Sequence, residues 1–331
     1  MANLTAAIEI GDLARVTELA SPLVPGGVDD GSEWTALHEA CHQGRAHIVE
    51  YLLSLPGVVP MGVDMFGQRP LDSAANAAVV AALIRDPRVD PAARDEYGYT
   101  ALHHLKDPAA VALLLSDRRI DPNALDSEKK TAFYAACDAG HMGVVRVLLG
   151  DKRVDRNLPS EIGWSPLRAA CSSGHPDVVA LLLADRDVEF GHGCLFGACY
   201  SNLASVISLL LRDPRVKPGH GLGLGHQTAL LASLVHGCVQ SVRLLIASGM
   251  ELNENMKMDK CGTWETNMTA VEAAAWAVNH SFNSWTDDPE RHLRSGKIAD
   301  LLHDYVKDRP GVTRRVREEL ALEEKLLSDR K

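Results

Sequence analysis

Aromatic side chains are scarce in this chain of 331 residues, where Phe, Trp and Tyr together make up 5%. Large rings hold helix axes apart, whereas Leu, Val and Ala let small helices approach closely. The rest of the composition, 46% hydrophobic and 24% charged, is close to the average of globular proteins. These values predict a folded protein whose aliphatic core lies between closely spaced helices.

Long hydrophobic runs are also missing, and no stretch approaches the roughly 18 apolar residues of a membrane span. The N-terminus, MANLTAAIEIGDLARVTELA, contains Glu9 and Asp12 and lacks a basic start, so it does not look like a secretory signal. The seven cysteines are an odd number, scattered through a chain too large to need disulfide staples. We therefore expect a reduced protein of the cytoplasm or nucleus.

Basic residues are outnumbered, with 34 Lys and Arg against 44 Asp and Glu, which gives a net charge of -10. A negative chain is repelled by phosphate backbones and by anionic lipid. We expect no general affinity for nucleic acid or for a membrane.

A repeated pattern runs through most of the chain. The stretch TALHEACHQGRAHIVEYLL at Thr35 returns as TALHHL at Thr100, TAFYAACDAGHMGVVRVLL at Thr131, SPLRAACSSGHPDVVALLL at Ser165 and TALLASLVHGCVQSVRLLI at Thr228. Weaker copies begin at residues 69, 193 and 269, so that units start 28 to 41 residues apart. This period, the TALH opening, the central Gly-His and the closing run of Val and Leu resemble the ankyrin repeat.

Each unit predicts two helices. The Thr opens a short helix, the central Gly ends it, and the apolar run forms a second helix whose stripe faces the neighbouring unit. The resemblance implies an all-α ankyrin-repeat solenoid of about nine helix-turn-helix units with β-hairpin fingers between them. We expect a single domain over residues 1–331, with a capping repeat at 1–27, repeats at 28–308, an insertion at 281–296 in the last repeat, and a capping helix at 309–331.

The cysteines and histidines of the repeat invite a comparison with a metal site. His38, Cys41, His42 and His47 lie close together in the sequence, but they are spread over both helices, whereas zinc needs four converging ligands. A cysteine recurs after an alanine in four units, which is typical of a small buried hydrophobe: Cys41, Cys137, Cys171 and Cys199. The resemblance also implies that His38 and His103 bond the Thr of their unit and the neighbouring finger. We expect no metal and no cofactor.

Two further candidates for chemistry are weak. The segment GHGLGLGHQ, residues 219–227, lacks the GK[ST] ending of a phosphate-binding loop and follows no apolar strand, so an elongated finger is favoured. A metal bound by His192, His220 and His226 at neighbouring finger tips stays open as an alternative. Outside the repeat positions there is no Ser/His/Asp set and no carboxylate pair, and we expect no enzymatic activity.

Two units depart from the pattern. The units that start at Arg69 and Thr100 have lost about three residues between their helices, and Asp107 with Pro108 reads as a cap followed by the first helical residue. We expect first helices one turn short, which would leave a notch in the concave face.

The resemblance implies that a protein partner binds the concave face, through residues just before the Thr and residues that end the first helix. Carried onto this chain, these positions are Trp34, His42, Met65, Phe66, Glu96, Tyr97, Tyr99 and Trp164. Aromatic residues are the usual anchors of interfaces, but stacking of these rings on neighbouring fingers is the alternative.

Charge adds to this prediction, because most of the net charge of -10 falls in the finger segments. Asp95 and Asp126 are expected to form local turn hydrogen bonds, and the remainder favours a partner with a basic segment. We expect a monomeric, non-enzymatic scaffold or adaptor. The alternatives are a substrate-recruiting subunit of a larger machine such as a ubiquitin ligase, docked through TRRVREELALEEKLL, and an enzyme with a site in the extended last repeat.

Overall fold

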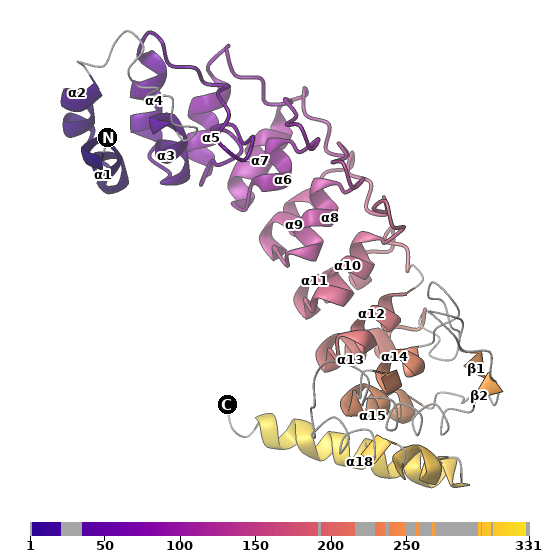
Figure 1. Cartoon of the computed structure of the whole chain (residues 1–331). Helices are drawn as coiled ribbons and strands as arrows, with labels where there is room; N and C mark the ends of the chain where they lie inside the picture. Colours follow the sequence, from indigo (N-terminus) through magenta and orange to yellow (C-terminus); the bar gives the residue numbers. More distant parts are fainter. Residues whose placement is uncertain are drawn as a thin grey trace. The chain divides into compact units, whose positions relative to one another are not determined.

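The computed structural model describes residues 2–20, 35–190, 193–215, 229–235, 238–248, 256–257, 267–268, 297–298, 300–305 and 307–328. Contacts divide the chain into two compact units, residues 1–166 and residues 167–331. The described residues form helices, turns and one pair of short strands (Figure 1), which confirms the predicted all-α repeat fold. Trp34, the glycine-rich segment 219–227 and the insertion 281–296 lie outside the described residues.

Unit 1 is built from two rows of helices. The helices described in it are α1 (Ala2–Ile10), α2 (Leu13–Ala20), α3 (Ala36–His42), α4 (Ala46–Ser54), α5 (Ala77–Ile84), α6 (Ala101–His104), α7 (Pro108–Ser116), α8 (Ala132–Asp138) and α9 (Met142–Gly150). First helices pack on first helices, as α1 does on α3 and α6 does on α8. Second helices pack in the order α2, α4, α5, α7 and α9. Each repeat therefore buries its apolar stripe against the next repeat.

Local sequence explains where these helices begin and what they bury. The hydroxyl of Thr131 accepts a hydrogen bond from the backbone N–H of Tyr134 at 3.0 Å, which caps α8. In α9, Val144, Val145 and Leu148 recur at helical spacing and are buried. The stripe read from the sequence is thus the face that packs.

The unit that starts at Arg69 loses more helix than predicted, whereas α6, in the unit that starts at Thr100, is about one turn short as predicted. Residues 70–74 form only turns, so the row of first helices is interrupted between α3 and the four-residue α6. Asn76 caps α5 through Val79 N–H at 3.0 Å and donates to the carbonyl of Gly44 at 3.1 Å. Asp107 accepts from the N–H groups of Ala110 and Ala77 at 3.1 and 3.0 Å, with Pro108 at the first helical position as predicted. Each capping side chain therefore also links its repeat to the preceding repeat.

A recurrent ion pair, which we call the Asp-x-Arg clamp, follows several second helices. Arg153 donates to Asp151 at 2.7 Å and to the carbonyl of Leu115, on the preceding second helix, at 2.7 Å. The same pattern joins Arg88 to Asp86 and to the carbonyl of Leu53. The guanidinium donates to backbone carbonyls at the C-terminal end of the preceding second helix, which have no partner within that helix. The clamp therefore holds neighbouring repeats together.

Unit 2 continues the same pairing. It contains α10 (Pro166–Ser173, whose first residue closes unit 1), α11 (Pro176–Ala184), α12 (Cys194–Tyr200), α13 (Ala204–Arg212), α14 (Ala229–Val235), α15 (Val239–Ala247), strands β1 (Met256–Lys257) and β2 (Asn267–Met268), and α18 (Arg309–Ser328). Helix α12 packs on α14, α13 on α15, and α15 on α18. None of the described helices is both long and apolar enough to span a bilayer.

The described fingers of unit 1 differ from the predicted β-hairpins. In unit 1 the segments 64–68, 95–99, 126–130 and 160–164 are tight turns without paired strands. Each has a backbone hydrogen bond between its first and last residues, such as Asp95 N–H to the Tyr99 carbonyl at 3.0 Å. Among the described residues the only strand pair is β1 with β2, where Met256 lies opposite Met268.

Candidate functional site

Aspartate side chains build three of the four finger turns that the structure describes in unit 1. The Oδ1 atom of Asp95 accepts hydrogen bonds from the N–H groups of Tyr97 at 2.9 Å and Tyr99 at 2.8 Å. Asp64 and Asp126 accept the equivalent pairs of hydrogen bonds in their own turns. The predicted local role of Asp95 and Asp126 is confirmed, and the tips are pre-organised by their own sequence.

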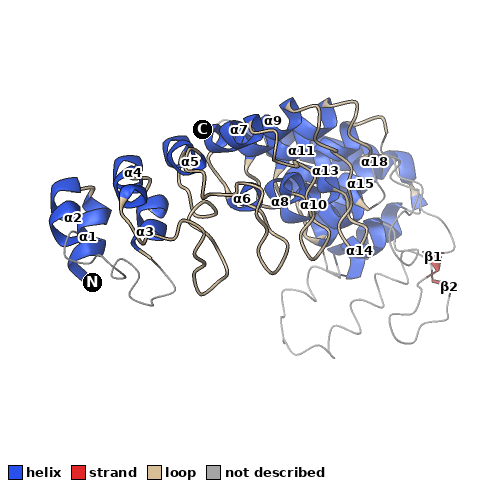
Figure 2. Ribbon diagram, turned by 90° about the horizontal axis from the view of Figure 1, so that it is seen from above, coloured by secondary structure: helices blue, strands red, loops and turns tan. Residues whose placement is uncertain are grey.

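Backbone hydrogen bonds join three neighbouring finger tips of unit 1. The N–H of Ser127 donates to the carbonyl of Tyr97 at 2.7 Å, and the N–H of Glu161 donates to the carbonyl of Glu128 at 2.7 Å. Gly98 turns the chain at a φ of 79°, a conformation that glycine adopts without strain. Figure 2 shows the finger loops of unit 1 projecting to the same side of the helices.

Large apolar side chains stand exposed on the finger tips of unit 1. Met65, Phe66 and Tyr97 expose 66, 65 and 53% of their surface, and Ile162 exposes 60%. Val63, which was missing from the predicted set, is exposed beside the first of these tips. Its signal in the sequence is an apolar residue directly before the turn aspartate. Exposed apolar groups gathered on a rigid edge are typical of an interaction surface.

Tyr99 and Trp164, two of the predicted anchors, are instead half-buried. The ring of Tyr99 lies 5.6 Å from that of His103 and 5.3 Å from that of His104, measured between centroids. Burial, followed by the nearby charge of Asp126, raises the pKa of the Tyr99 hydroxyl. Tyr99 therefore packs as a strut between its finger and the first helix, which is the alternative weighed for these rings.

The charges left for a partner are fewer than the sequence suggests. Glu96 and Glu161 are exposed on the tips, whereas Glu128 forms an ion pair with Lys130 at 2.5 Å. His42, a further predicted contact, is exposed at the end of α3. The acidic edge is therefore carried mainly by Glu96 and Glu161.

The histidine of the TALH motif joins neighbouring units as the resemblance implies. In the repeat that begins at Thr35, Nδ1 of His38 lies 2.9 Å from the Thr35 hydroxyl and Nε2 lies 3.0 Å from the Gln68 carbonyl. His103 makes the same contacts to Thr100 and Lys130 at 3.0 and 3.2 Å. These two histidines therefore have a structural role in joining neighbouring repeats.

In the repeat that begins RPLD, Arg69 and Asp72 take the place of the Thr and His of the motif. The N–H of Arg69 donates to Asp72 at 2.8 Å, and the Arg69 guanidinium reaches the carbonyl of Arg94 in the next finger. Burial raises the pKa of the Asp72 carboxyl, although the Arg69 N–H opposes the shift. We did not predict that Arg69 and Asp72 replace the Thr and His of the motif. The sequence indicates it, because RPLD aligns with TALH.

The repeated cysteines are fully buried free thiols. Burial raises the pKa of Cys199 to about 12 and raises those of Cys41 and Cys137 as well, so that the thiolate form is suppressed. Within the described residues, no three His, Cys, Asp or Glu side chains come together to hold a metal ion. His192, His220 and His226, the alternative metal set, lie outside those residues.

A stacked series of helix pairs that presents a rigid, apolar row of finger tips defines a protein-interaction repeat domain. A family model described as ankyrin repeats, three copies, matches residues 4–95 and 100–193, and the chain belongs to the ankyrin repeat family. No curated protein matches the chain significantly. Ankyrin repeats generally bind protein partners and are typically non-enzymatic.

Proposed function

We propose that the protein is a non-enzymatic scaffold or adaptor that binds a partner protein along the finger tips of unit 1. The observation that carries this proposal is the exposure of Phe66 and Tyr97 on neighbouring tips that their own turns hold rigid. A rigid aromatic anchor loses little conformational entropy on binding, which is why such residues dominate interface energetics.

The chemistry of the tips favours a partner with a basic segment between apolar residues. Glu96 lies within the aromatic row, and its carboxylate is close to Gly67, next to Phe66. Exposed carboxylates of this kind raise the association rate with a basic partner and weaken as salt is added. We infer a monomer that acts in the cytoplasm or nucleus.

Affinity capture with the tagged full chain tests the proposal. The wild type is compared with a Phe66→Ala, Tyr97→Ala double variant and with Tyr51→Ala, a matched control on the second helix α4. We expect a defined set of proteins that the double variant recovers at least about 30-fold less well and that the control retains. Equal recovery by all three chains would remove the finger tips from the interface.

A further inference from the structure

A groove runs along α18 in unit 2. One part is a cavity of about 480 Å³ lined by Arg309, Pro310, Thr313, Arg314, Arg317 and Glu318. A second part, of about 330 Å³, is lined by Ser208, Leu211, Arg212, Leu244, Ala247, Ser248, Arg317, Leu320 and Ala321. Arg317 lines both of these open hollows, which lie next to each other along about 18 Å of α18, and we call the two together the groove.

Helix α18 is held firmly beneath this groove. Val312 and Val316 are buried on its inner side, where it packs on α15. The Arg317 guanidinium donates to the carbonyl of Ala247 at 2.6 Å, and Arg243 forms an ion pair with Glu319 at 3.0 Å. Val312 and Val316 thus serve packing, and the arginines beside them line the groove.

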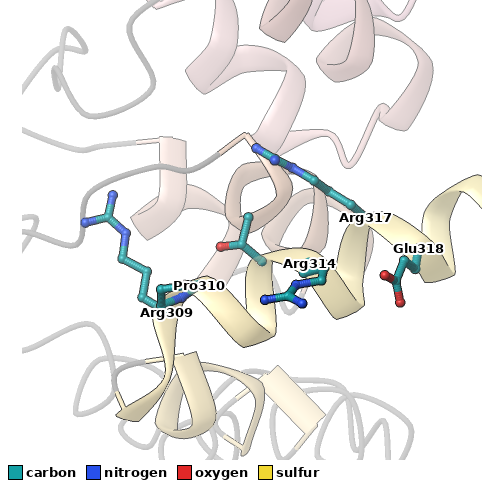
Figure 3. Close-up of a pocket in the computed structure, with 6 residues that line it drawn as sticks. Arg309, Pro310, Arg314, Arg317 and Glu318 are labelled. Atoms are coloured by element: carbon teal, nitrogen blue, oxygen red, sulfur yellow. The ribbon is translucent and has the colours of Figure 1, made fainter.

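The charge of the groove is opposite to that of the chain. Its walls carry Arg212, Arg309, Arg314 and Arg317 against Glu318, while the net charge of the chain is -10. Figure 3 shows Arg309 and Arg314 on α18, with Arg317 extending toward the neighbouring helices. Arg314 is exposed and forms no ion pair with a residue that the structure describes. Guanidinium groups arranged along a groove recognise carboxylates by paired hydrogen bonds.

The other end of the groove is apolar. Leu211, Leu244 and Leu320 are half-buried side chains from α13, α15 and α18 that meet around the second cavity. A ligand that fills the whole groove must therefore present carboxylates to the arginines and an aliphatic side chain to the leucines.

We propose that this groove binds an acidic polypeptide segment of a second protein, with a leucine or similar side chain between the three leucines. A free phosphate would occupy only the arginine-lined end and leave the leucines uncovered. A flat anionic bilayer would not enter the groove and would be repelled by the chain as a whole. The site is independent of the finger tips and has the opposite charge preference, so one chain would join a basic partner to an acidic one.

Fluorescence anisotropy on the full chain tests this assignment. The probe is a fluorescein-labelled peptide of about ten residues in which Glu and Asp flank two leucines, long enough to cover the groove. Two comparison peptides carry Gln and Asn for the acids, or Ser for the leucines. We expect the acidic, leucine-bearing peptide to bind most tightly and to weaken as salt is raised.

Variants of exposed arginines locate the site. Arg314→Glu should weaken peptide binding on the order of tenfold, since it removes one attraction and adds a repulsion. Arg314→Lys keeps the charge but loses the paired hydrogen bonds, so it should weaken binding by less than Arg314→Glu does. Arg118→Glu, an exposed arginine of unit 1, is the matched control and should bind as the wild type does. Thermal melting should be the same for all these chains.

Three results would overturn the proposal. The first is equal binding of the acidic and the neutral peptide, and the second is unchanged binding to Arg314→Glu. The third is Arg314-dependent binding to phosphatidylserine vesicles without binding of the peptide, which would assign the groove to a membrane surface. None of these results bears on the finger tips, so failure here and failure of the proposed function are distinguishable.

Discussion

Tyr97 and Tyr99 lie in the same finger turn and have the same side chain, but their surroundings give them different tasks. Tyr97 is exposed at the tip, whereas Tyr99 packs on His103 and His104. The sequence identified both as finger aromatics. It could not separate them, because the separation depends on which ring the turn directs at the helix behind it.

We expect Tyr99→Ala to lower the free energy of unfolding by about 1 to 3 kcal/mol, through lost ring contacts and burial. Tyr97→Ala, the matched control in the same turn, should change it by less than about 0.5 kcal/mol. Urea denaturation of both variants measures the difference. Equal losses would mean that both rings support the finger.

The buried thiols give a second prediction for single residues. Cys41, Cys137 and Cys199 are inaccessible and their pKa values are raised by burial, so native protein should react slowly with a thiol reagent. The same cysteines should react at once in denaturant. Fast labelling of these three in the native state would contradict their placement between helices.

At the scale of the element, the helices were the most predictable feature and the fingers the least. Thr131 and the Val144, Val145 and Leu148 stripe carry local signals, so the helix start and buried face could be read directly. Fingers depend on hydrogen bonds between distant residues, such as Ser127 to Tyr97, which no local pattern encodes. The groove along α18 was missed for the same reason, since its leucines come from three helices.

The burial of His103 makes stability depend on pH. Burial lowers the pKa of His103 below its ordinary value of 6.5, so in acid the unfolded chain binds the proton more readily than the folded chain. Stability from this group is complete above about pH 6.5 and is lost as the pH falls from there to the folded pKa. We expect the free energy of unfolding to fall over that window, and His103→Gln to remove part of the slope. An equal slope in the variant would exclude His103 as its source.

On the scale of the whole molecule, repeat proteins are stabilised mainly by contacts between neighbouring units, so damage remains local. Leu148 in unit 1 and Leu182 in unit 2 are both fully buried in second helices. Each truncation to Ala should cost about 2 to 5 kcal/mol. We expect chemical denaturation to show two transitions, with Leu148→Ala lowering the transition of unit 1 and Leu182→Ala that of unit 2. A single transition that both substitutions shift equally would show that the chain unfolds as one cooperative block.

The central claim is that the finger tips of unit 1 bind a protein through exposed aromatic side chains. Isothermal titration of a captured partner against the wild type, Tyr97→Ala and Tyr51→Ala tests it most directly. We predict that Tyr97→Ala weakens binding by about 2 kcal/mol at an unchanged melting temperature, while Tyr51→Ala retains the affinity of the wild type. Unchanged affinity of Tyr97→Ala, together with a sharply lowered melting temperature, would make Tyr97 a structural strut and contradict the claim.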